Sequence, residues 1–181
     1  MIILQSLYFM LPAYIANMAP VFAKKLGVLK FFSKPIDGGR TFRGKPIFGT
    51  HKTWRGFVVG VVAAIAIVWL QYFLYSIPIF QKISLLDYLK INPWLFGFLM
   101  GFGALFGDLV KSFFKRRVNF APGTPWFPFD QIDFVLGVLI FVAPVYFPSS
   151  LVLLIILIVS PILHIATNNI GFFLRIKDTR W

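Results

Sequence analysis

Three aspartates and four cationic side chains gather in one short stretch of this sequence, and they are its best candidates for chemistry. The stretch covers residues 107–137 and reads GDLVKSFFKRRVNFAPGTPWFPFDQIDFVLG. The chain has six acidic residues and no glutamate, so half of its carboxylate side chains lie here. Apolar runs flank the stretch, and charge near a membrane is costly unless it is paired, hydrated or bound to an ion. We therefore expect the reaction centre of an integral membrane enzyme at this place.

The first aspartate shares one face of a predicted helix with three other polar residues. The spacing i, i+3, i+4, i+7 is followed by Asp108, Lys111, Ser112 and Lys115. The same predicted helix has two G-x-x-x-G spacings, which let a neighbouring helix approach closely, formed by Gly97, Gly101, Gly103 and Gly107. The alternative is an Asp108–Lys111 ion pair within one helix, which only lowers the cost of inserting the charges.

The other two aspartates, Asp130 and Asp133, follow Pro128 at the start of an apolar run. Helix capping is the alternative explanation, because the helix dipole favours acids in a first turn. Capping explains one aspartate well and two less well. Together with Asp108 they offer the oxygen ligands that Mg²⁺ prefers, so the sequence predicts a magnesium site made of Asp108, Asp130 and Asp133.

A basic, glycine-rich segment precedes the second apolar run and reads PIDGGRTFRGKPIFGTHKTWRG over residues 35–56. Its glycines permit close approach of the backbone to an anion, and its lysines and arginines supply charge-assisted donors. It contains no Walker A motif. Ordinary cytoplasmic positive charge or contact with anionic lipid is the alternative. That alternative accounts for Lys24, Lys25 and Lys30, but poorly for the glycines and for residues 52–56.

The elements that position these residues are predicted to be membrane-spanning helices. The chain is 59% hydrophobic and 13% charged, whereas a soluble domain is about half apolar and about a quarter charged. We expect an all-α integral membrane protein, a bundle of about five transmembrane helices in a single domain. The predicted spans cover about 1–23, 56–77, 94–114, 132–147 and 150–174. The predicted cytoplasmic loops cover 24–55 and 115–131.

The basic residues also predict the orientation. All of the eighteen lysines and arginines except Lys82 and Lys90 lie on one side of the predicted spans. The positive-inside rule then places the N-terminus outside, the C-terminus in the cytoplasm and the active site facing the cytoplasm of a multi-pass cell-membrane protein. The net charge of +12 predicts anionic partners such as membrane lipids, nucleotides or phosphates. Nucleic acid is not expected, because the charge lies in loops that flank the membrane.

The chain has no cysteine, which excludes disulfides, thiol catalysis and cysteine-bound zinc. Its two histidines are far apart in the sequence, which argues against a histidine metal site. Polar residues interrupt the last apolar run, namely His164, Thr167, Asn168 and Asn169. Two interpretations stay open for them: hydrogen bonding between helices, or the lining of a polar cavity.

Taken together, these motifs resemble the signature of the CTP:phosphatidate cytidylyltransferase (CDP-diglyceride synthase) superfamily. The matching residues are Gly107-Asp108, Ser112-x-x-Lys115-Arg116, Pro122-Gly123 and Asp130-x-x-Asp133. The first-loop string and the five-span size look more like the archaeal branch, the CDP-archaeol synthases. The resemblance implies an Mg²⁺-dependent reaction in which CTP and an isoprenoid-ether glycerol phosphate give a CDP-lipid and pyrophosphate. The implied acceptor is 2,3-bis-O-geranylgeranyl-sn-glycerol 1-phosphate.

The resemblance also implies roles for individual residues. Asp108, Asp130 and Asp133 would hold Mg²⁺ and, with Lys111, form the catalytic set. Contacts to phosphates of CTP or lipid would come from Lys111, Ser112, Lys115 and Arg116. The residues expected to fold over the nucleotide are Asp37, Gly38, Arg43, Lys52, Thr53 and Arg55. Backbone groups of the first loop or Asn169 are the candidates for recognising cytosine.

Three other functions remain open at this point. A CTP-dependent polyprenol kinase on the same scaffold would transfer the γ-phosphate to an alcohol, with Asp130 or Asp133 as the base. A small transporter would use Asp108 as an ion site. A purely structural protein would tolerate Asp108→Asn and Asp133→Asn. A CDP-alcohol phosphotransferase is rejected, because the rest of its motif does not follow Asp37-Gly38. The glycine spacings fit contacts within one chain or between two, so a homodimer also stays open.

Overall fold

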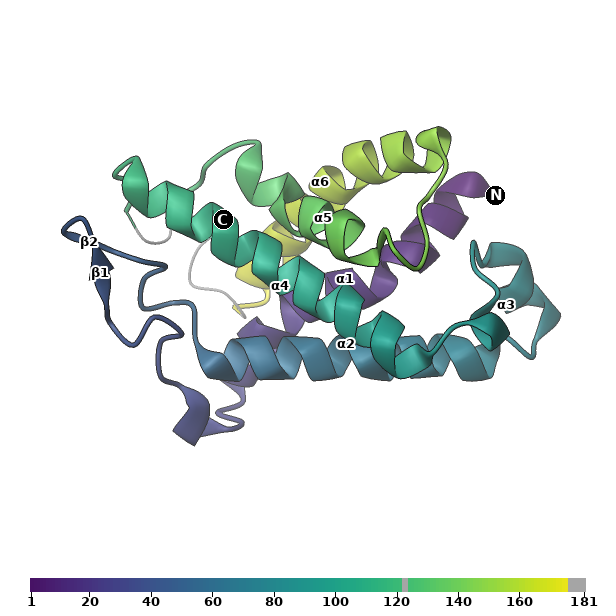
Figure 1. Cartoon of the computed structure of the whole chain (residues 1–181), viewed down its shortest axis with the longest axis horizontal. Coiled ribbons are helices and arrows are strands. Elements are labelled where there is room, and N and C mark those ends of the chain that lie inside the picture. The colour runs from purple at the N-terminus through teal and green to yellow at the C-terminus, as the bar shows by residue number, and fades with distance from the viewer. Residues whose placement is uncertain (122–123, 176–181) are drawn as a thin grey trace.

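Helices supply almost all of the regular structure in the computed structural model, which describes residues 1–121 and 124–175 (Figure 1). Four of them are long and apolar enough to cross a membrane: α1 (Ile2–Lys25), α2 (Trp54–Leu74), α4 (Pro93–Arg117) and α6 (Ser150–Phe173). The shorter helices are α3 (Pro78–Ile83) and α5 (Phe129–Val142), with 3₁₀ turns at Lys30–Phe32 and Tyr88–Lys90. The prediction of an all-α membrane bundle is confirmed.

The helix bounds differ from the predicted spans most clearly at α5. The sequence predicted a span over 132–147, whereas α5 begins at Phe129 and ends at Val142, with 14 residues. At 1.5 Å per residue it is about 21 Å long, shorter than a hydrocarbon core of about 30 Å. Pro144 explains the early end, because proline has no backbone N–H to donate the next helical hydrogen bond. Helix α4 also runs to Arg117, into the loop predicted at 115–131.

The glycines of α4 bring it against two neighbours on two different faces. A Cβ atom at Gly101 would lie 2.8 Å from Ala64 Cβ in α2. A Cβ atom at Gly103 would lie 2.8 Å from the carbonyl oxygen of Gly137 in α5. No side chain larger than hydrogen fits at these contacts without a shift of backbone. The predicted close approach is therefore used within the chain, between α4 and both α2 and α5.

The apolar core lies where α1, α4 and α5 meet. Its largest fully buried side chains include Phe9 of α1, Phe96 of α4 and Phe134 of α5. One polar pair joins two helices inside the bundle: the hydroxyls of Tyr14 in α1 and Ser160 in α6 are 2.7 Å apart. Such hydrogen bonds tie helices together where water is absent.

Between α1 and α2 the chain forms a short antiparallel hairpin that the sequence did not predict, made of β1 (Thr41–Phe42) and β2 (Lys45–Pro46). Figure 1 shows this hairpin at the end of the bundle where α2 begins and α4 ends. The N-terminus and α3 lie at the opposite end (Figure 1). The hairpin, the basic end of α4 and the acidic start of α5 therefore share one end of the molecule.

Candidate active site

Lys111 is the centre of the charged cluster. Its Nζ atom lies 3.0 Å from Asp108 Oδ1, 2.9 Å from Asp130 Oδ1 and 2.9 Å from Asp133 Oδ2. Asp133 is the most enclosed of the aspartates, with a side chain 6% exposed. Helices α4 and α5 can bring these groups together because Gly107 lies directly against the backbone of Asp133. The structure thus gathers all three predicted aspartates around the predicted lysine.

Two further lysines complete this cluster. Lys52, from the end of the first loop, places Nζ 2.5 Å from Asp108 Oδ2. Lys115 places Nζ 3.0 Å and 2.9 Å from the two carboxylate oxygens of Asp130. We call these six residues the carboxylate–lysine centre. Since its ion pairs join α4, α5 and the first loop, an Asp108–Lys111 pair within one helix does not account for it.

The donor set of the carboxylate–lysine centre suits Mg²⁺, which binds carboxylate oxygens. Each of the three aspartates is bound to lysine, and the described residues contain no group of three or more acidic, histidine or cysteine side chains arranged to hold a metal. Mg²⁺ needs its oxygens at about 2.0–2.1 Å. The ion and the Lys111 ammonium therefore exclude each other from this position, and magnesium binding stays a prediction.

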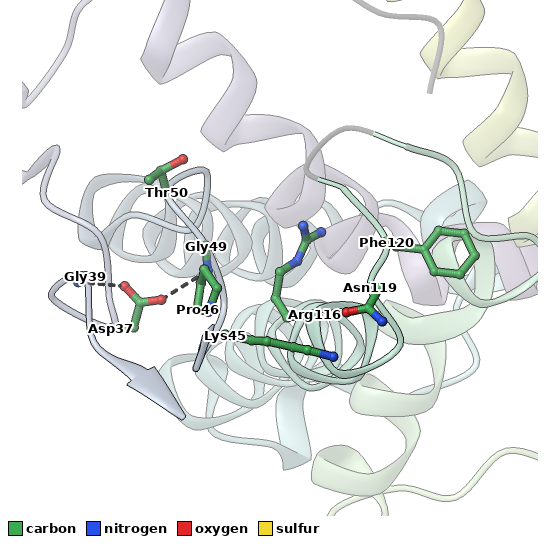
Figure 2. A pocket seen from close by; sticks show the side chains of 9 residues that line it. All are labelled: Asp37, Gly39, Lys45, Pro46, Gly49, Thr50, Arg116, Asn119 and Phe120. Atoms are coloured by element: carbon green, nitrogen blue, oxygen red, sulfur yellow. Dashed lines mark hydrogen bonds between the residues drawn. The ribbon is translucent and has the colours of Figure 1, made fainter. Parts of the chain in front are cut away.

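A cavity of about 340 Å³ opens beside the carboxylate–lysine centre, between the first loop and the end of α4. Its lining residues are Asp37, Gly39, Lys45, Pro46, Gly49, Thr50, Arg116, Asn119 and Phe120. Figure 2 shows the Arg116 side chain between the loop that carries Asp37 and the turn that carries Asn119. Arg116 follows Lys115 in the chain, and Lys52 comes two residues after Thr50, so the same two segments supply residues to the cavity and to the centre. Its size falls in the range of small-molecule sites.

Asp37 organises the loop wall of this cavity. Its carboxylate accepts hydrogen bonds from the backbone N–H of Gly39 at 2.9 Å, of Phe48 at 2.9 Å and of Gly49 at 3.0 Å. Burial alone would raise the pKa of Asp37, but these donors outweigh it and hold the pKa below its usual value. Gly38 has φ +58° in the turn that this carboxylate closes, a conformation that favours glycine.

The remaining first-loop candidates lie at the start of α2 and on the hairpin. Thr53 is the N-cap of α2, since its Oγ1 accepts a hydrogen bond from Gly56 N at 3.2 Å. Arg43 lies over the ring of Phe42, 5.5 Å from its centroid. The Nε atom of Arg55 is buried and has no hydrogen-bond partner among the described residues.

Two predicted substrate contacts face the backbone of their own helices. The hydroxyl of Ser112 donates to the Asp108 carbonyl oxygen at 2.7 Å. The amide of Asn169 donates to the Ile165 carbonyl oxygen on α6 at 2.8 Å. No hydrogen bond recorded for the described residues joins Asn169 to the carboxylate–lysine centre. The motif residues Pro122 and Gly123 lie outside the residues that the structure describes.

The predicted site residues did not include Lys45, Asn119 and Phe120, which line the cavity. A signal for Asn119 existed, because asparagine often follows a helix in the left-handed conformation. Asn119 has φ +63° just after α4, where Phe120 N donates to the Lys115 carbonyl oxygen at 3.1 Å. Lys45 carries no signal in the sequence beyond being one of several basic residues in the loop.

The fold and this site together define a class, multi-pass membrane proteins with a charged site at one end of a helical bundle. Comparison with known proteins narrows the class. The family model described as CarS-like, CDP-archaeol synthase, matches residues 1–181. The chain belongs to the CDP-archaeol synthase family.

Relatives and a solved structure agree with this assignment. The chain is 39% identical to the CDP-archaeol synthase of Thermococcus onnurineus, with 99% of this chain and 97% of that protein covered. It is 38% identical to that of Pyrococcus furiosus, with 99% and 98% covered. It also resembles a solved intramembrane enzyme for the biosynthesis of archaeal membrane lipids. That likeness has a TM-score of 0.72 and 29% identity over 92% of this chain and 94% of the other.

Proposed function

We propose that this protein transfers CMP from CTP to an isoprenoid-ether glycerol phosphate, and releases pyrophosphate. The relatives named above are CDP-archaeol synthases. The observation that carries the proposal is the meeting of Asp108, Asp130 and Asp133 around Lys111, next to a cavity with cationic walls. The expected acceptor is 2,3-bis-O-geranylgeranyl-sn-glycerol 1-phosphate, and the expected orientation has this end of the bundle facing the cytoplasm.

The reaction requires charge neutralisation more than proton transfer. An oxygen of the lipid phosphate attacks the α-phosphorus of CTP, and the bond to the β-phosphate bridging oxygen breaks. A phosphomonoester has a second pKa of about 6, so the nucleophile is already ionised at neutral pH. No general base is needed, and the main difficulty is the approach of two anions.

The cationic side chains of the cavity suit the triphosphate. Arg116 and Lys45 line it directly, and Lys115 follows at the border of the carboxylate–lysine centre. We assign these side chains to the phosphates of CTP, and Lys111 and Lys52 to phosphate groups at the reacting centre. Asp37 would act on the nucleotide indirectly, because its carboxylate is occupied by backbone donors of the loop.

Asp108, Asp130 and Asp133 are the residues that would hold Mg²⁺. When bound, the ion would neutralise the phosphates and the leaving pyrophosphate. Lys111 would then have to leave the position between the three carboxylates. Its ammonium would pair with the substrate phosphates instead of with the aspartates.

The kinase alternative finds less support in this geometry. Transfer to an alcohol needs a base, and both candidates, Asp130 and Asp133, accept hydrogen bonds or ion pairs from Lys111. Transport finds less support too, because the three aspartates gather at one end of the bundle. A pathway across the membrane needs polar groups on both sides.

Labelled CTP tests the proposal. Purified protein in detergent receives Mg²⁺, geranylgeranyl-ether glycerol phosphate and CTP labelled at either the α or the γ position. We expect α label in the lipid, pyrophosphate in solution, and loss of both with EDTA. γ label in an added polyprenol would make the protein a kinase. No transfer to any lipid phosphate, in several detergents, would refute the cytidylyltransferase assignment.

A further inference from the structure

Arg117, the last residue of α4, reaches across to the β1–β2 hairpin. Its Nη1 atom donates a hydrogen bond to the carbonyl oxygen of Phe42. Its Nη2 atom donates to the carbonyl oxygens of Lys45, at 3.2 Å, and of Pro46. One guanidinium therefore serves three backbone acceptors that belong to both strands of the hairpin.

Two aromatic rings and a hydrogen bond from the hairpin to α4 strengthen this connection. The guanidinium carbon of Arg117 lies 5.4 Å from the ring centroid of Phe42 and 4.8 Å from that of Phe113. Lys45 Nζ donates to the backbone carbonyl oxygen of Arg117 at 2.9 Å. The hairpin and the end of α4 thus hold each other through side chains from both partners.

This connection joins the hairpin wall of the cavity to the end of α4 that carries Arg116. Lys45 and Pro46 line one wall, and Arg116 and Asn119 line the other. Arg117 itself does not line the cavity, and its recorded hydrogen bonds go to hairpin carbonyls. A guanidinium is a planar donor that stacks on rings, whereas an ammonium cannot reach several fixed acceptors in this way.

We propose that Arg117 is a positioning residue that holds the β1–β2 hairpin at a fixed distance from the end of α4 and so keeps the nucleotide cavity ready for CTP. The identity of the ligand rests on the proposed function. The competing explanation is a cytoplasmic positive charge with no particular partner. That explanation predicts the same affinity for CTP in Arg117→Lys, and even in a variant that loses the charge.

Binding of CTP to the full chain in detergent separates the two explanations. The variants are Arg117→Gln, Arg117→Lys and, as a control with the same charge change, Lys30→Gln, whose side chain is exposed. We expect the Kd for CTP to rise at least about tenfold in Arg117→Gln, because charge-assisted hydrogen bonds are lost. The Kd of Arg117→Lys should lie between those of Arg117→Gln and the wild type, and the Kd of Lys30→Gln should match that of the wild type. In turnover, KM for CTP should rise while kcat at saturating CTP changes by less than about threefold.

Limited trypsin digestion provides a readout that does not depend on the ligand. Cleavage after Arg40 or Arg43, identified by mass, should be faster in Arg117→Gln than in Lys30→Gln. If Arg117→Gln fails to fold, as judged by thermal melting, Phe42→Leu replaces it, since this change removes the stacking and keeps the backbone acceptors.

Equal CTP affinity and equal cleavage in Arg117→Gln and the control would overturn the inference. Faster cleavage in a protein whose wild type binds no CTP would keep the positioning role and refute the nucleotide assignment. Weaker binding with unchanged cleavage would overturn the positioning role and make Arg117 a direct contact of CTP.

Discussion

The carboxylate–lysine centre and the β1–β2 hairpin meet at one end of the bundle, but they are held by different means. The centre is fixed by helices whose backbones touch at Gly103, Gly107 and Gly137. The hairpin is fixed by the charged side chains of Asp37 and Arg117, which bind backbone groups. Packed backbones cannot adjust gradually, whereas a few polar bonds can open and close. We therefore expect the helix backbones that carry the aspartates to keep their spacing, and the hairpin to depend on Asp37 and Arg117 for its position.

The largest effect is expected from Lys111→Met. It leaves three carboxylates close together without their shared cation, and breaking a buried ion pair costs about 3–5 kcal/mol. Melting in detergent with EDTA should show a much lower Tm than for the wild type. Mg²⁺ should restore part of this loss if the aspartates can bind the ion, and Lys30→Met is the control. A Tm that stays insensitive to divalent ions in both proteins would argue against the metal site.

Asp133→Asn keeps the shape of the side chain and removes its charge. On the proposal that this carboxylate holds Mg²⁺, its loss should lower turnover at least about a hundredfold. Expression and the trypsin pattern of the hairpin should remain those of the wild type, because the loop is held separately. Asp108→Asn should behave in the same way. Near-normal turnover in both variants would show that the carboxylates do not take part in catalysis.

Gly137→Ala tests the contact of backbones directly. The new Cβ atom would meet the Gly103 carbonyl carbon at 3.0 Å and the Gly107 Cα atom at 3.0 Å. Overpacking of this kind costs about 1–3 kcal/mol, and it should also lower turnover by separating Asp108 from Asp133. Thermal melting measures the loss of stability, and the CTP assay measures the loss of turnover. Ile140→Val is the matched control, because Ile140 lies on the same helix and is 70% exposed. Equal Tm values for the two would contradict the rigid contact.

The smallest effect is expected from Asp37→Asn, and it should depend on pH. The folded protein holds the pKa of Asp37 below its usual value of 3.8. The carboxylate therefore stabilises the loop above pH about 4, and this contribution is lost as the pH falls through the folded-state pKa. The Tm difference between wild type and Asp37→Asn should be largest near pH 7 and should shrink below pH 4. A constant difference over this range would refute the role of the charge.

The sequence was sufficient for the helical membrane class and for the gathering of the aspartates. The charge in an apolar chain indicated Asp108, and the position of Asp130 and Asp133 at the start of the next helix placed them near it. The glycine spacings indicated close packing of α4. Each of these features depends on local order along the chain, so a single sequence can reveal it.

The sequence could not show features that depend on how distant segments meet. Lys111 contacts carboxylates from another helix only because the register between α4 and α5 allows it. Asp37 was predicted as a nucleotide contact, but its carboxylate binds the backbone around Gly49, twelve residues further on. Arg117 resembled an ordinary cytoplasmic charge until the position of the hairpin was known. These are tertiary arrangements, and residue types alone do not determine them.

The contacts of Gly103 and Gly107 with α5 have a consequence for a protein that is embedded in a lipid bilayer. The distance between Asp108 and Asp133 is set inside the polypeptide, where the backbones of the two helices touch at these glycines. Changes in temperature and lipid composition alter the bilayer around the bundle, but they do not act directly on this spacing. A member of a lipid-synthesising family would thus keep the same geometry at its centre while the composition of the surrounding membrane changes.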